Sequence, residues 1–337
     1  MTSRICLVGE FEKDPDEAMR KTAQEYVAQL QSEFDVLPIN ASECFRPSNV
    51  RSIVAFDPDA IHFIPGPSIY SFAYTKFVGS LTDATVIHSA PHHGFHDLDG
   101  DIYYQSSHRL RKLIPALQPD KLLVQSPESK QFFEKHGVDC EYLFSGVSLD
   151  THKPVSTDRK TELQEKYNLP VDEHLTLHVG SLKEWRNIPV LPDVIDESTQ
   201  LVVVGSTATQ EEKAVQRQLE AAGAIVIHEY IENIEEIYSA ADLYVFPTQE
   251  QVACCDVPLT VLEAMATNLP VLTTTFGGLP VMFDEGDGLF FGDDPDQLST
   301  KFDEARRVEE PNTREMVDPY SWSQAGEALA TVYSRLS

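Results

Sequence analysis

The sequence has little positive charge. Its 337 residues include 26 Lys and Arg against 54 Asp and Glu, a formal net charge of −28 at pH 7. The acidic residues are spread along the chain, so we expect an acidic surface that repels phosphate backbones and anionic lipid headgroups and excludes nucleic acid as a partner. We interpret the excess as adaptation to a high-salt cytoplasm, where screening permits such a charge. An ordinary acidic enzyme is the alternative.

Cysteine is also scarce. The five cysteines are an odd number without metal-ligand spacing, and no basic-then-apolar signal peptide precedes the first expected strand. We therefore expect a cytoplasmic protein. No apolar run approaches the roughly 18 to 20 residues that span a bilayer, so we expect membrane contact, if any, to be peripheral on the inner face.

The glycine pattern of a dinucleotide-binding turn is missing as well. Neither Val8-Gly9-Glu10-Phe11 nor Val204-Gly205-Ser206-Thr207 continues as G-x-G-x-x-G. A dehydrogenase that binds a dinucleotide through this turn is therefore excluded.

What the sequence does contain is a regular alternation of short apolar runs and helix-length segments. This rhythm predicts an α/β protein with two Rossmann-like βαβ domains that face each other across a cleft. Helix starts are expected at Asp14-Pro15-Asp16-Glu17 and at Ser126-Pro127-Glu128. In each segment a capping residue stands directly before a proline in the first helical turn. The expected strands are Ile5–Val8, Asp35–Ile39, Ala60–Ile64, Ala84–His88, Lys121–Gln125, Leu175–Val179, Gln200–Val204, Ala224–Ile227, Leu243–Phe246 and Pro270–Thr274.

A polar, proline-closed stretch, Ser145–Pro154, interrupts the alternation and is the expected linker. We assign residues 1–150, together with a C-terminal helix in 319–337, to an acceptor-side domain. Residues 151–318 form the expected nucleotide-sugar domain.

One stretch, residues 240–291, carries most of a binding site. It contains the strand Leu243–Phe246, a helix over Val261–Ala266 with Glu263 near its start, and the turn Gly277-Gly278 after a second strand. Ligands of parallel α/β sheets bind at the carboxyl edge of the strands. We therefore expect Glu263 and the two glycines to face one cleft.

At this point the second half of the chain resembles retaining glycosyltransferases of family 4, which have the two-domain GT-B fold and use a nucleotide-activated sugar. The resemblance extends over roughly 120–291. It is carried by SGVSLDTHKP, LHVGSLKEWRN, LVVVGS, IYSAADLYVFPT and VLEAMATNLPVLTTTFGGLP, while DPYSWSQAGEALATVYSRL resembles the closing helix that crosses back onto the first domain. With the acidic composition, it indicates a halophilic archaeon as the source.

The resemblance implies roles for particular residues. Arg186 matches a lysine that contacts the donor phosphates, and Lys183 compensates for a family arginine that is replaced by Ser181. Glu263 matches the glutamate that binds the ribose hydroxyls, as a carboxylate can do with both protons. The backbone amides of Gly277 and Gly278 approach the donor. Leu259 and Thr260, at the start of the same helix as Glu263, are assigned to the donor site with them.

The family's first donor-site glutamate, which contacts the sugar, corresponds to Cys255. Either Glu250 or Asp256 supplies the missing carboxylate, and we rank Asp256 ahead. A simple cap for the helix of Glu263 is the alternative for Asp256. Cys254 and Cys255 are interpreted as buried small hydrophobes, with a reactive pair as the alternative.

Four histidines lie within nine residues at the end of an N-terminal strand: His88, His92, His93 and His96. The family often has one histidine here, near the donor sugar, and His88 is the best match, ahead of His92. A structural role for His88 and a zinc site formed by the cluster are alternatives, although the spacing is irregular. Family 4 transfer requires no bound metal or other cofactor.

The resulting prediction is a glycosyltransferase that moves a sugar from a nucleotide-diphosphate sugar to an acceptor hydroxyl with retention. A glycan precursor, a lipid-linked sugar and a small metabolite remain open as acceptors. Two alternatives remain: a non-catalytic homologue that binds a nucleotide sugar or a protein partner, and a sugar-nucleotide epimerase. Cys255, Ser181 and the lone Gly9 near the first strand motivate the non-catalytic alternative.

Overall fold

The computed structural model describes residues 3–12, 14–66, 68–91, 114–135, 137–196, 198–208, 212–250 and 254–335. The chain divides into two compact units. Unit 1 contains Met1–Gly146, Cys255–Val257 and Trp322–Ser337, and unit 2 contains Val147–Cys254 and Pro258–Ser321. The short excursion Cys255–Val257, which joins unit 1 between two segments of unit 2, has no counterpart in the boundaries expected from the sequence.

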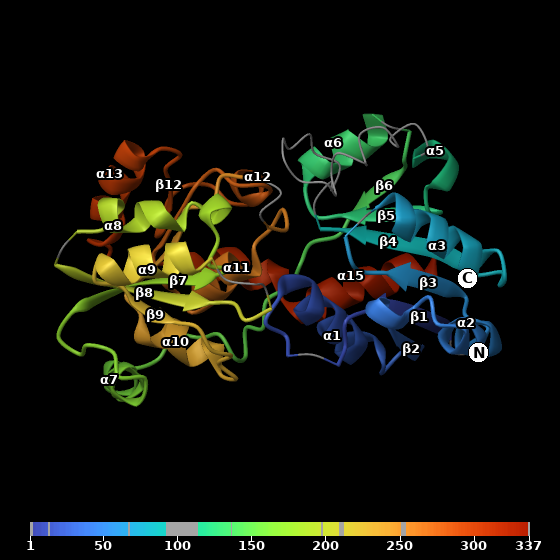
Figure 1. The fold of residues 1–337 in the computed structure, drawn as a ribbon, viewed down its shortest axis with the longest axis horizontal. Coiled ribbons are helices and arrows are strands. Elements are labelled where there is room, and N and C mark those ends of the chain that lie inside the picture. Colours follow the sequence, from blue (N-terminus) through green and yellow to red (C-terminus); the bar gives the residue numbers. More distant parts are fainter. Residues whose placement is uncertain are drawn as a thin grey trace. The chain divides into compact units, whose positions relative to one another are not determined.

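Unit 1 is built on a six-stranded sheet in the order β2-β1-β3-β4-β5-β6, and every described pairing is parallel (Figure 1). Its two central strands, β3 and β4, are buried along nearly their whole length, as expected of strands covered on both faces. The strands are β1 (Arg4–Gly9), β2 (Asp35–Asn40), β3 (Ala60–Phe63), β4 (Thr85–Ala90), β5 (Lys121–Val124) and β6 (Cys140–Tyr142).

The helices of unit 1 follow the alternation, with one corrected start. The helix expected to open at Asp14-Pro15 begins instead at Ala18, because Glu17 is extended and its side chain accepts the N–H of Arg20 at 3.2 Å. The start at Ser126-Pro127 is confirmed, since the Ser126 hydroxyl accepts the Ser129 N–H at 3.1 Å. The helices are α1 (Ala18–Leu30), α2 (Pro47–Phe56), α3 (Ile69–Gly79), α5 (Ile114–Leu117), α6 (Pro127–Lys135) and α15 (Trp322–Ser334), with a 3₁₀ turn at Ala41–Glu43.

The C-terminal helix α15 lies in unit 1, against α1. A buried histidine ties it to the sheet: His62 Nδ1 is 2.7 Å from the Tyr333 hydroxyl and Nε2 is 2.9 Å from the Ser89 hydroxyl. Burial lowers the pKa of His62 to about 3, so the imidazole is neutral. A neutral ring is thus part of what fastens the end of the chain to unit 1.

Unit 2 repeats the plan with a second six-stranded parallel sheet, in the order β12-β11-β10-β7-β8-β9. The strands of both sheets match the expected ones within two residues at each end, except that β6 and β12 were not expected. The strands are β7 (His174–Gly180), β8 (Thr199–Gly205), β9 (Ile225–Ile227), β10 (Leu243–Phe246), β11 (Val271–Thr273) and β12 (Leu289–Phe291). These two sheets are two Rossmann-like domains.

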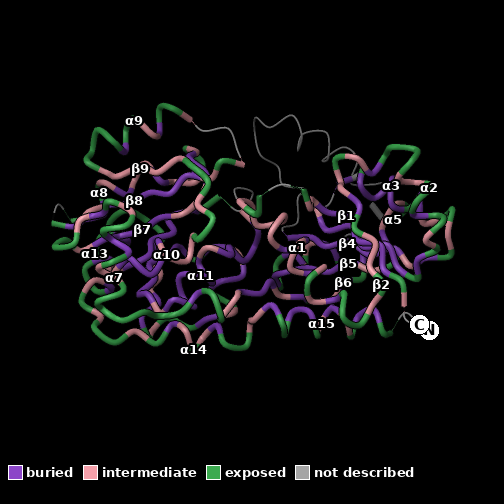
Figure 2. Tube along the Cα trace, turned by 90° about the horizontal axis from the view of Figure 1, so that it is seen from below, coloured by how far each residue is buried: buried purple, intermediate pink, exposed green. Residues whose placement is uncertain are grey.

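The core of unit 2 lies along its central strands, which are buried in Figure 2. One cluster joins Val203 and Val245 of the sheet to Leu191 and Phe302 of the covering helices. The helices are α7 (Thr157–Lys166), α8 (Leu191–Val194), α9 (Lys213–Ala221), α10 (Ile234–Ala240), α11 (Leu259–Ala266), α12 (Leu279–Met282), α13 (Pro295–Ala305) and α14 (Thr313–Val317), with 3₁₀ turns at Glu184–Arg186, Ile188–Val190 and Asp318–Tyr320. No helix in the described part of the chain is both long and apolar enough to cross a membrane.

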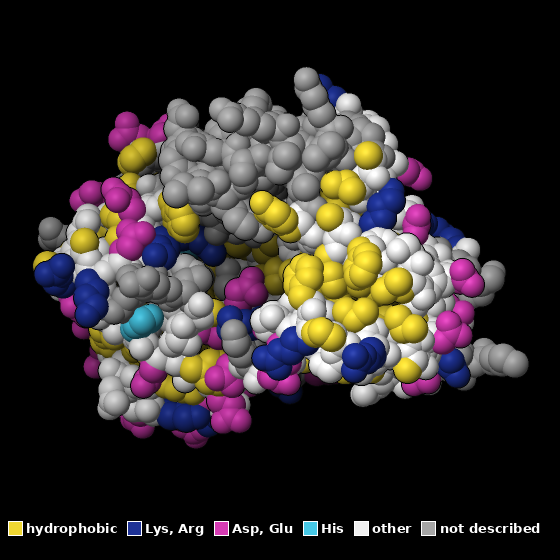
Figure 3. Space-filling model, turned by 45° about the vertical axis from the view of Figure 1, so that its right-hand side comes forward, with side chains coloured by type: hydrophobic (Ala, Val, Ile, Leu, Met, Phe, Trp, Pro, Cys, Tyr) yellow, Lys and Arg dark blue, Asp and Glu magenta, His cyan; other side chains and the backbone are white. Residues whose placement is uncertain are grey.

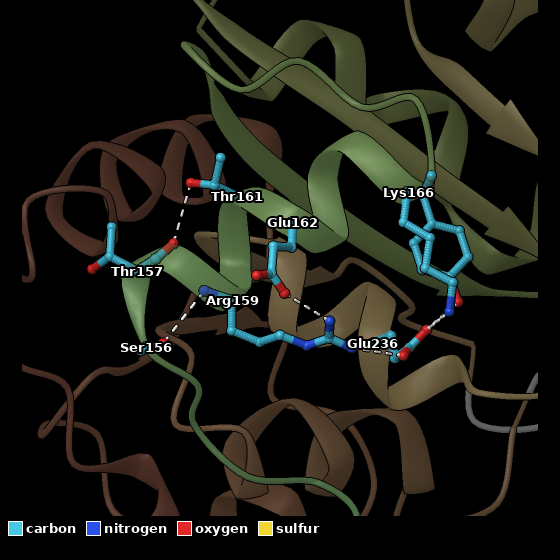
Figure 4. Close-up of polar contacts among 8 residues, drawn as sticks. Ser156, Thr157, Arg159, Thr161, Glu162, Lys166 and Glu236 are labelled. Atoms are coloured by element: carbon cyan, nitrogen blue, oxygen red, sulfur yellow. Dashed lines mark hydrogen bonds and ion pairs between the residues drawn. The ribbon is translucent and has the colours of Figure 1, made fainter.

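Charged side chains hold α7 against α10. Glu236 of α10 is the centre: it pairs with Arg159 at 3.1 Å and with Lys166, and it accepts the Tyr167 hydroxyl at 2.6 Å (Figure 4). Arg159 also pairs with Glu162 at 2.9 Å. Since α7 is almost entirely polar, these contacts supply much of its attachment to unit 2.

We expect Glu236→Gln to lower the free energy of unfolding by about 1 kcal/mol, because a network of ion pairs contributes more than one exposed pair. The loss should shrink in molar potassium chloride, which screens the pairs. Chemical denaturation at two salt concentrations measures both effects. Glu134→Gln is the matched control, since Glu134 has one exposed partner, Lys130, at 3.7 Å. Equal losses for the two variants would contradict the role of Glu236.

A second prediction concerns pH. The unfolded chain binds a proton at His62 near pH 6.5, whereas folded His62 resists protonation down to about pH 3. Folding stability should therefore fall as pH decreases through this window, and His62 alone should cost roughly 2 kcal/mol between pH 7 and 5. His62→Gln should flatten the slope of the unfolding free energy against pH, whatever its absolute stability. An unchanged slope would show that His62 does not contribute.

Candidate functional site

Three loops of unit 2 meet at the carboxyl ends of neighbouring strands. The sheet order places β7, β10 and β11 side by side, so the loops that follow them are adjacent. Thr248, after β10, donates its hydroxyl to the Arg186 carbonyl at 3.2 Å, and the Asn187 amide donates to the Pro247 carbonyl at 3.1 Å. The Thr274 hydroxyl, after β11, donates to the Thr248 carbonyl. We call these three loops the stitched edge.

Arg186 and Lys183 both lie in the loop after β7 and are partly buried. The Arg186 Nε is buried without a hydrogen-bond partner among the described residues. Lys183 pairs with Glu212 at 3.6 Å, so its charge is partly compensated inside the same unit. Arg186 is therefore the cation of this pair that still has hydrogen-bonding capacity for a ligand.

His178, on β7, was not recognised from the sequence. Its ring is buried, its Nδ1 donates to the Val245 carbonyl at 2.9 Å, and its Nε2 meets no hydrogen-bond partner in the described chain. Burial, with a smaller contribution from the Arg186 charge, lowers the pKa of His178 to about 4. A side chain at Gly180 would come within 3.1 Å of Nε2, so the strand end must be glycine or yield slightly. The signal was present in LHVGS, but a histidine within a strand is usually structural.

Glu263 projects from α11 and is buried, with 6% of its surface exposed. The Tyr238 hydroxyl of α10 donates to Glu263 Oε2 at 3.0 Å. Burial, reinforced by the negative charge of Glu263, raises the pKa of Tyr238 well above its usual value, so the hydroxyl stays protonated as a donor. This contact orients the carboxylate that the resemblance assigns to the ribose hydroxyls.

The far end of α11 is fixed by Arg314, which the sequence also did not single out. Its guanidinium donates to the carbonyls of Ala266 at 2.5 Å, His152 at 2.7 Å and Leu149 at 2.8 Å. A cation at a helix C-terminus is favourable and satisfies the last carbonyls. Arg314 thereby holds the helix of Glu263 to the beginning of unit 2.

The glycine turn Gly277-Gly278 follows β11 and precedes α12. Gly277 has φ +53°, a left-handed conformation that glycine adopts without cost, and Gly278 has φ −80°. Within the described chain, the N–H groups of Gly277 and Gly278 meet no acceptor. Successive amides in such a turn form a concave donor surface for anions.

The other donor-site candidates of unit 2 lie around the same edge. Glu250 is exposed in the loop after β10, Leu259 is buried at the first turn of α11, and Thr260 is half-buried beside it. The structure thus collects in one unit the larger part of the predicted site: Arg186, Lys183, Glu250, Leu259, Thr260, Glu263, Gly277 and Gly278.

Cys255 and Asp256 belong instead to unit 1. Asp256 is 2% exposed, its Oδ2 accepts the hydroxyls of Ser126 and Ser129 at 2.5 Å each, and its N–H donates to the Pro91 carbonyl at 2.6 Å. Burial raises the pKa of Asp256 to about 6, although the two serines favour the charged form. The alternative that Asp256 caps α11 is wrong: the cap of α11 is Pro258, and Asp256 contacts the first turn of α6.

Four of the five cysteines are buried, Cys255 among them, whereas Cys254 is partly exposed. All five are free, Cys255 is 7% exposed, and its Sγ is 3.1 Å from the Val257 carbonyl. A catalytic role for the pair has no support from a neighbouring base in these contacts.

His88 is fully buried in unit 1. Its ring stacks on Phe63 and meets Phe72 edge-on, both at 4.9 Å between centroids, and Nε2 is 2.7 Å from the Thr75 hydroxyl. Burial lowers the pKa of His88 well below its usual value. These contacts fit the structural alternative, and a role at the donor sugar stays a prediction. His92, His93 and His96 lie outside the described residues, and the described chain contains no cluster of metal-ligating side chains.

Comparison with known structures identifies the class of fold. HepE of Anabaena, solved in complex with UDP-glucose, superposes with a TM-score of 0.76 over 98% of this chain and 99% of that one, at 13% identity. Sucrose-phosphate synthase of Thermosynechococcus elongatus superposes with a TM-score of 0.76 over 99% of both chains, at 17% identity. The fold is therefore GT-B, with two Rossmann-like domains.

The sequence comparisons give a more particular likeness within that class. Residues 173–305, most of unit 2, match the family of glycosyl transferases group 1. The D-inositol 3-phosphate glycosyltransferase of Xylanimonas cellulosilytica is 28% identical over 232 residues, which are 62% of this chain and 55% of the relative. The match thus spans about half the length of that curated relative. The stitched edge lies within the matched residues.

Proposed function

We propose that this protein is a retaining glycosyltransferase, which transfers a sugar from a nucleoside-diphosphate sugar to an acceptor hydroxyl. The observation that carries the proposal is the stitched edge, which holds a cation and a glycine turn whose amides meet no acceptor in the described chain. The buried carboxylate of Glu263 lies on α11 of the same unit, the unit that matches glycosyl transferases group 1. These three chemistries suit a diphosphate and a ribose.

In this proposal the positively charged side chains and the backbone amides bind the diphosphate, and the carboxylate binds the ribose. The diphosphate leaving group gains negative charge as the glycosidic bond to it breaks, and Arg186 with the Gly277 and Gly278 amides stabilises that charge. Lys183 adds a second positive charge to the diphosphate site when its ion pair with Glu212 opens. Glu263, held by Tyr238, accepts the two ribose hydroxyls and fixes the nucleotide in place.

The bond changes balance without a cofactor. The acceptor oxygen forms a bond to the anomeric carbon on the face from which the diphosphate departs, which retains the configuration. The acceptor proton passes to an oxygen of the leaving diphosphate. We propose no resident metal, since Arg186, Lys183 and backbone amides supply the positive charge.

For the donor we propose one compound to test first, and for the acceptor a choice of three chemical classes. HepE was solved with UDP-glucose, so UDP-glucose is the first donor to test here. The acceptor is a hydroxyl of a lipid-linked sugar, a surface-glycan precursor or a small metabolite. We also propose a high-salt cytoplasm as the setting, because 54 acidic residues face only 26 basic ones, and assays are therefore run in molar potassium chloride as well as dilute buffer.

The test of transfer is release of nucleoside diphosphate from a panel of UDP-, GDP- and ADP-sugars, with and without membrane extract. We expect one donor to be consumed, and to be consumed faster when membrane extract supplies the acceptor. NMR of the product should show the same anomeric configuration as the donor. Arg186→Ala should lower kcat about a hundredfold or more. Arg307→Ala is the matched control, because Arg307 lies exposed just beyond the end of α13 and its substitution should leave the rate unchanged.

The other outcomes select among the alternatives. Conversion of the donor sugar without an acceptor would establish an epimerase, and binding without release would establish a non-catalytic homologue. Asp256→Asn distinguishes the two roles of Asp256: turnover stops if its carboxylate contacts the sugar, and persists if it only anchors residues 255–257 to α6.

Nucleotide binding has its own test. We expect Glu263→Ala to weaken binding of the preferred nucleoside diphosphate tenfold to a hundredfold, since charge-assisted hydrogen bonds contribute roughly 1.5 to 3 kcal/mol. Tyr238→Phe keeps the packing but removes the supporting hydroxyl, so a loss of a few fold should result. Isothermal titration calorimetry measures both, with Glu235→Gln, which changes a half-buried glutamate of α10, as control. Unchanged affinity in Glu263→Ala would place the ribose elsewhere.

A further inference from the structure

Helix α3 of unit 1 is apolar on the side that faces solvent as well as on the side that faces the core. Phe72, Thr75 and Val78 are fully buried, as a covering helix requires. Yet Tyr70 is 68% exposed and Phe77 is 57% exposed. A helix in a soluble protein normally presents polar residues outward, so the outer side of α3 is suited to a surface that the described part of the chain does not supply.

The exposed residues lie along one side of α3. Tyr70 and Phe77 are two helical turns apart, with Leu81, 45% exposed, just beyond the end of the helix. Tyr74, which lies between them in the helix, is itself buried, with 5% of its surface exposed. Phe45, 67% exposed, packs its ring against Tyr74 at 4.4 Å between centroids. We call these five residues the α3 face. Tyr70, Phe45 and Phe77 are the three most exposed aromatic side chains of the described part of the chain.

The charge around the α3 face departs from the rest of the molecule. The chain has a net charge of −28, but residues 60–82 contain no Asp or Glu, the longest such run in the sequence. Arg51 and Lys76 lie on the two helices of this region, and Arg46 pairs with Glu43 at its start. Figure 3 shows the apolar surface with Lys and Arg side chains along its border. An anionic surface would meet least repulsion here.

The size of the α3 face argues against a second protein chain as its occupant. The exposed parts of Phe45, Tyr70 and Phe77 together equal about two whole aromatic side chains, or roughly 400 Å². A stable protein interface buries about 800 Å² on each partner. A few protruding rings beside cations match instead the interfacial region of a bilayer, where aromatic rings sit at headgroup depth and Lys and Arg reach the phosphates.

We propose that the α3 face docks unit 1 on an anionic lipid bilayer. Tyr70, Phe77 and Phe45 enter the headgroup region, while Arg51 and Lys76 contact lipid phosphates. The remaining acidic surface is repelled by the same bilayer and so sets the orientation of unit 1 on it. The inference stands apart from the proposed transfer reaction, because docking requires neither nucleotide nor acceptor.

The test is flotation of the full chain with vesicles of phosphatidylglycerol and phosphatidylcholine, and with phosphatidylcholine alone. We expect wild type to float with the anionic vesicles and far less with the neutral ones. The double variant Tyr70→Glu, Phe77→Glu should reduce the bound fraction at least tenfold. The double variant Val155→Glu, Val171→Glu adds the same charge at two exposed apolar residues of unit 2, 37% and 43% exposed, and should bind like wild type. Thermal unfolding checks that each variant is folded.

Three results would overturn the proposal. Wild type that floats with neither vesicle has no docking surface of this kind. A folded Tyr70→Glu, Phe77→Glu variant that floats like wild type places the contact elsewhere. A wild-type dimer in solution that becomes a monomer on the same substitutions assigns the α3 face to a second copy of the chain. The milder pair Tyr70→Ser, Phe77→Ser repeats the comparison if the glutamates prevent folding.

Discussion

The candidate site depends on the hydrogen bonds through Thr248. Its hydroxyl donates to the loop of Arg186, and its carbonyl accepts from Thr274, which leads into the glycine turn. The three loops come from strands far apart in the chain, so only the order β11-β10-β7 makes these contacts available. The backbone around Arg186 and Gly277 is therefore fixed before any ligand arrives. Preorganised donors cost no reorganisation when charge develops, which is why such an edge suits a diphosphate leaving group.

The sequence predicted the fold well where the strands are buried and poorly at the edges. Strands such as Leu243–Phe246 are continuous apolar runs between turn residues, and their limits can be read directly. The strands β6 and β12 have three residues each and lie at sheet edges, where such a short run carries too little pattern. The predicted start of α1 was wrong for another reason: Asp14-Pro15 satisfies the local capping rules, whereas the observed N-cap, Glu17, is a residue that these rules do not favour.

For the candidate site, too, local sequence patterns indicated some residues, while partners distant in the sequence were missed. Arg186 and Gly277 were singled out shortly after strand ends, and Glu263 near the start of a helix, so each is tied to a local sequence pattern. The partners that fix them were not, since Tyr238 is 25 positions from Glu263 and Asp256 is 127 and 130 positions from its two serines. Sequence distance misled most for Asp256. It stands seven positions before Glu263 yet belongs to the other unit, because Pro91, Ser126 and Ser129 anchor it there.

Most of the α3 face, and the glycine turn of the candidate site, lie in segments that lack acidic residues. Asp and Glu make up 54 of 337 residues, about one in six, yet 60–82 and 264–283 contain none. The second run holds β11 and the glycine turn, where a carboxylate would repel a diphosphate. Burial explains part of each gap, since strands β3 and β11 are enclosed. It does not explain the absence of acid around the exposed Tyr70 and Phe77 in the first run or around the half-buried Gly277 in the second. In a chain with such an excess of acid, accessible segments that omit it are where a negatively charged ligand or surface meets the least repulsion.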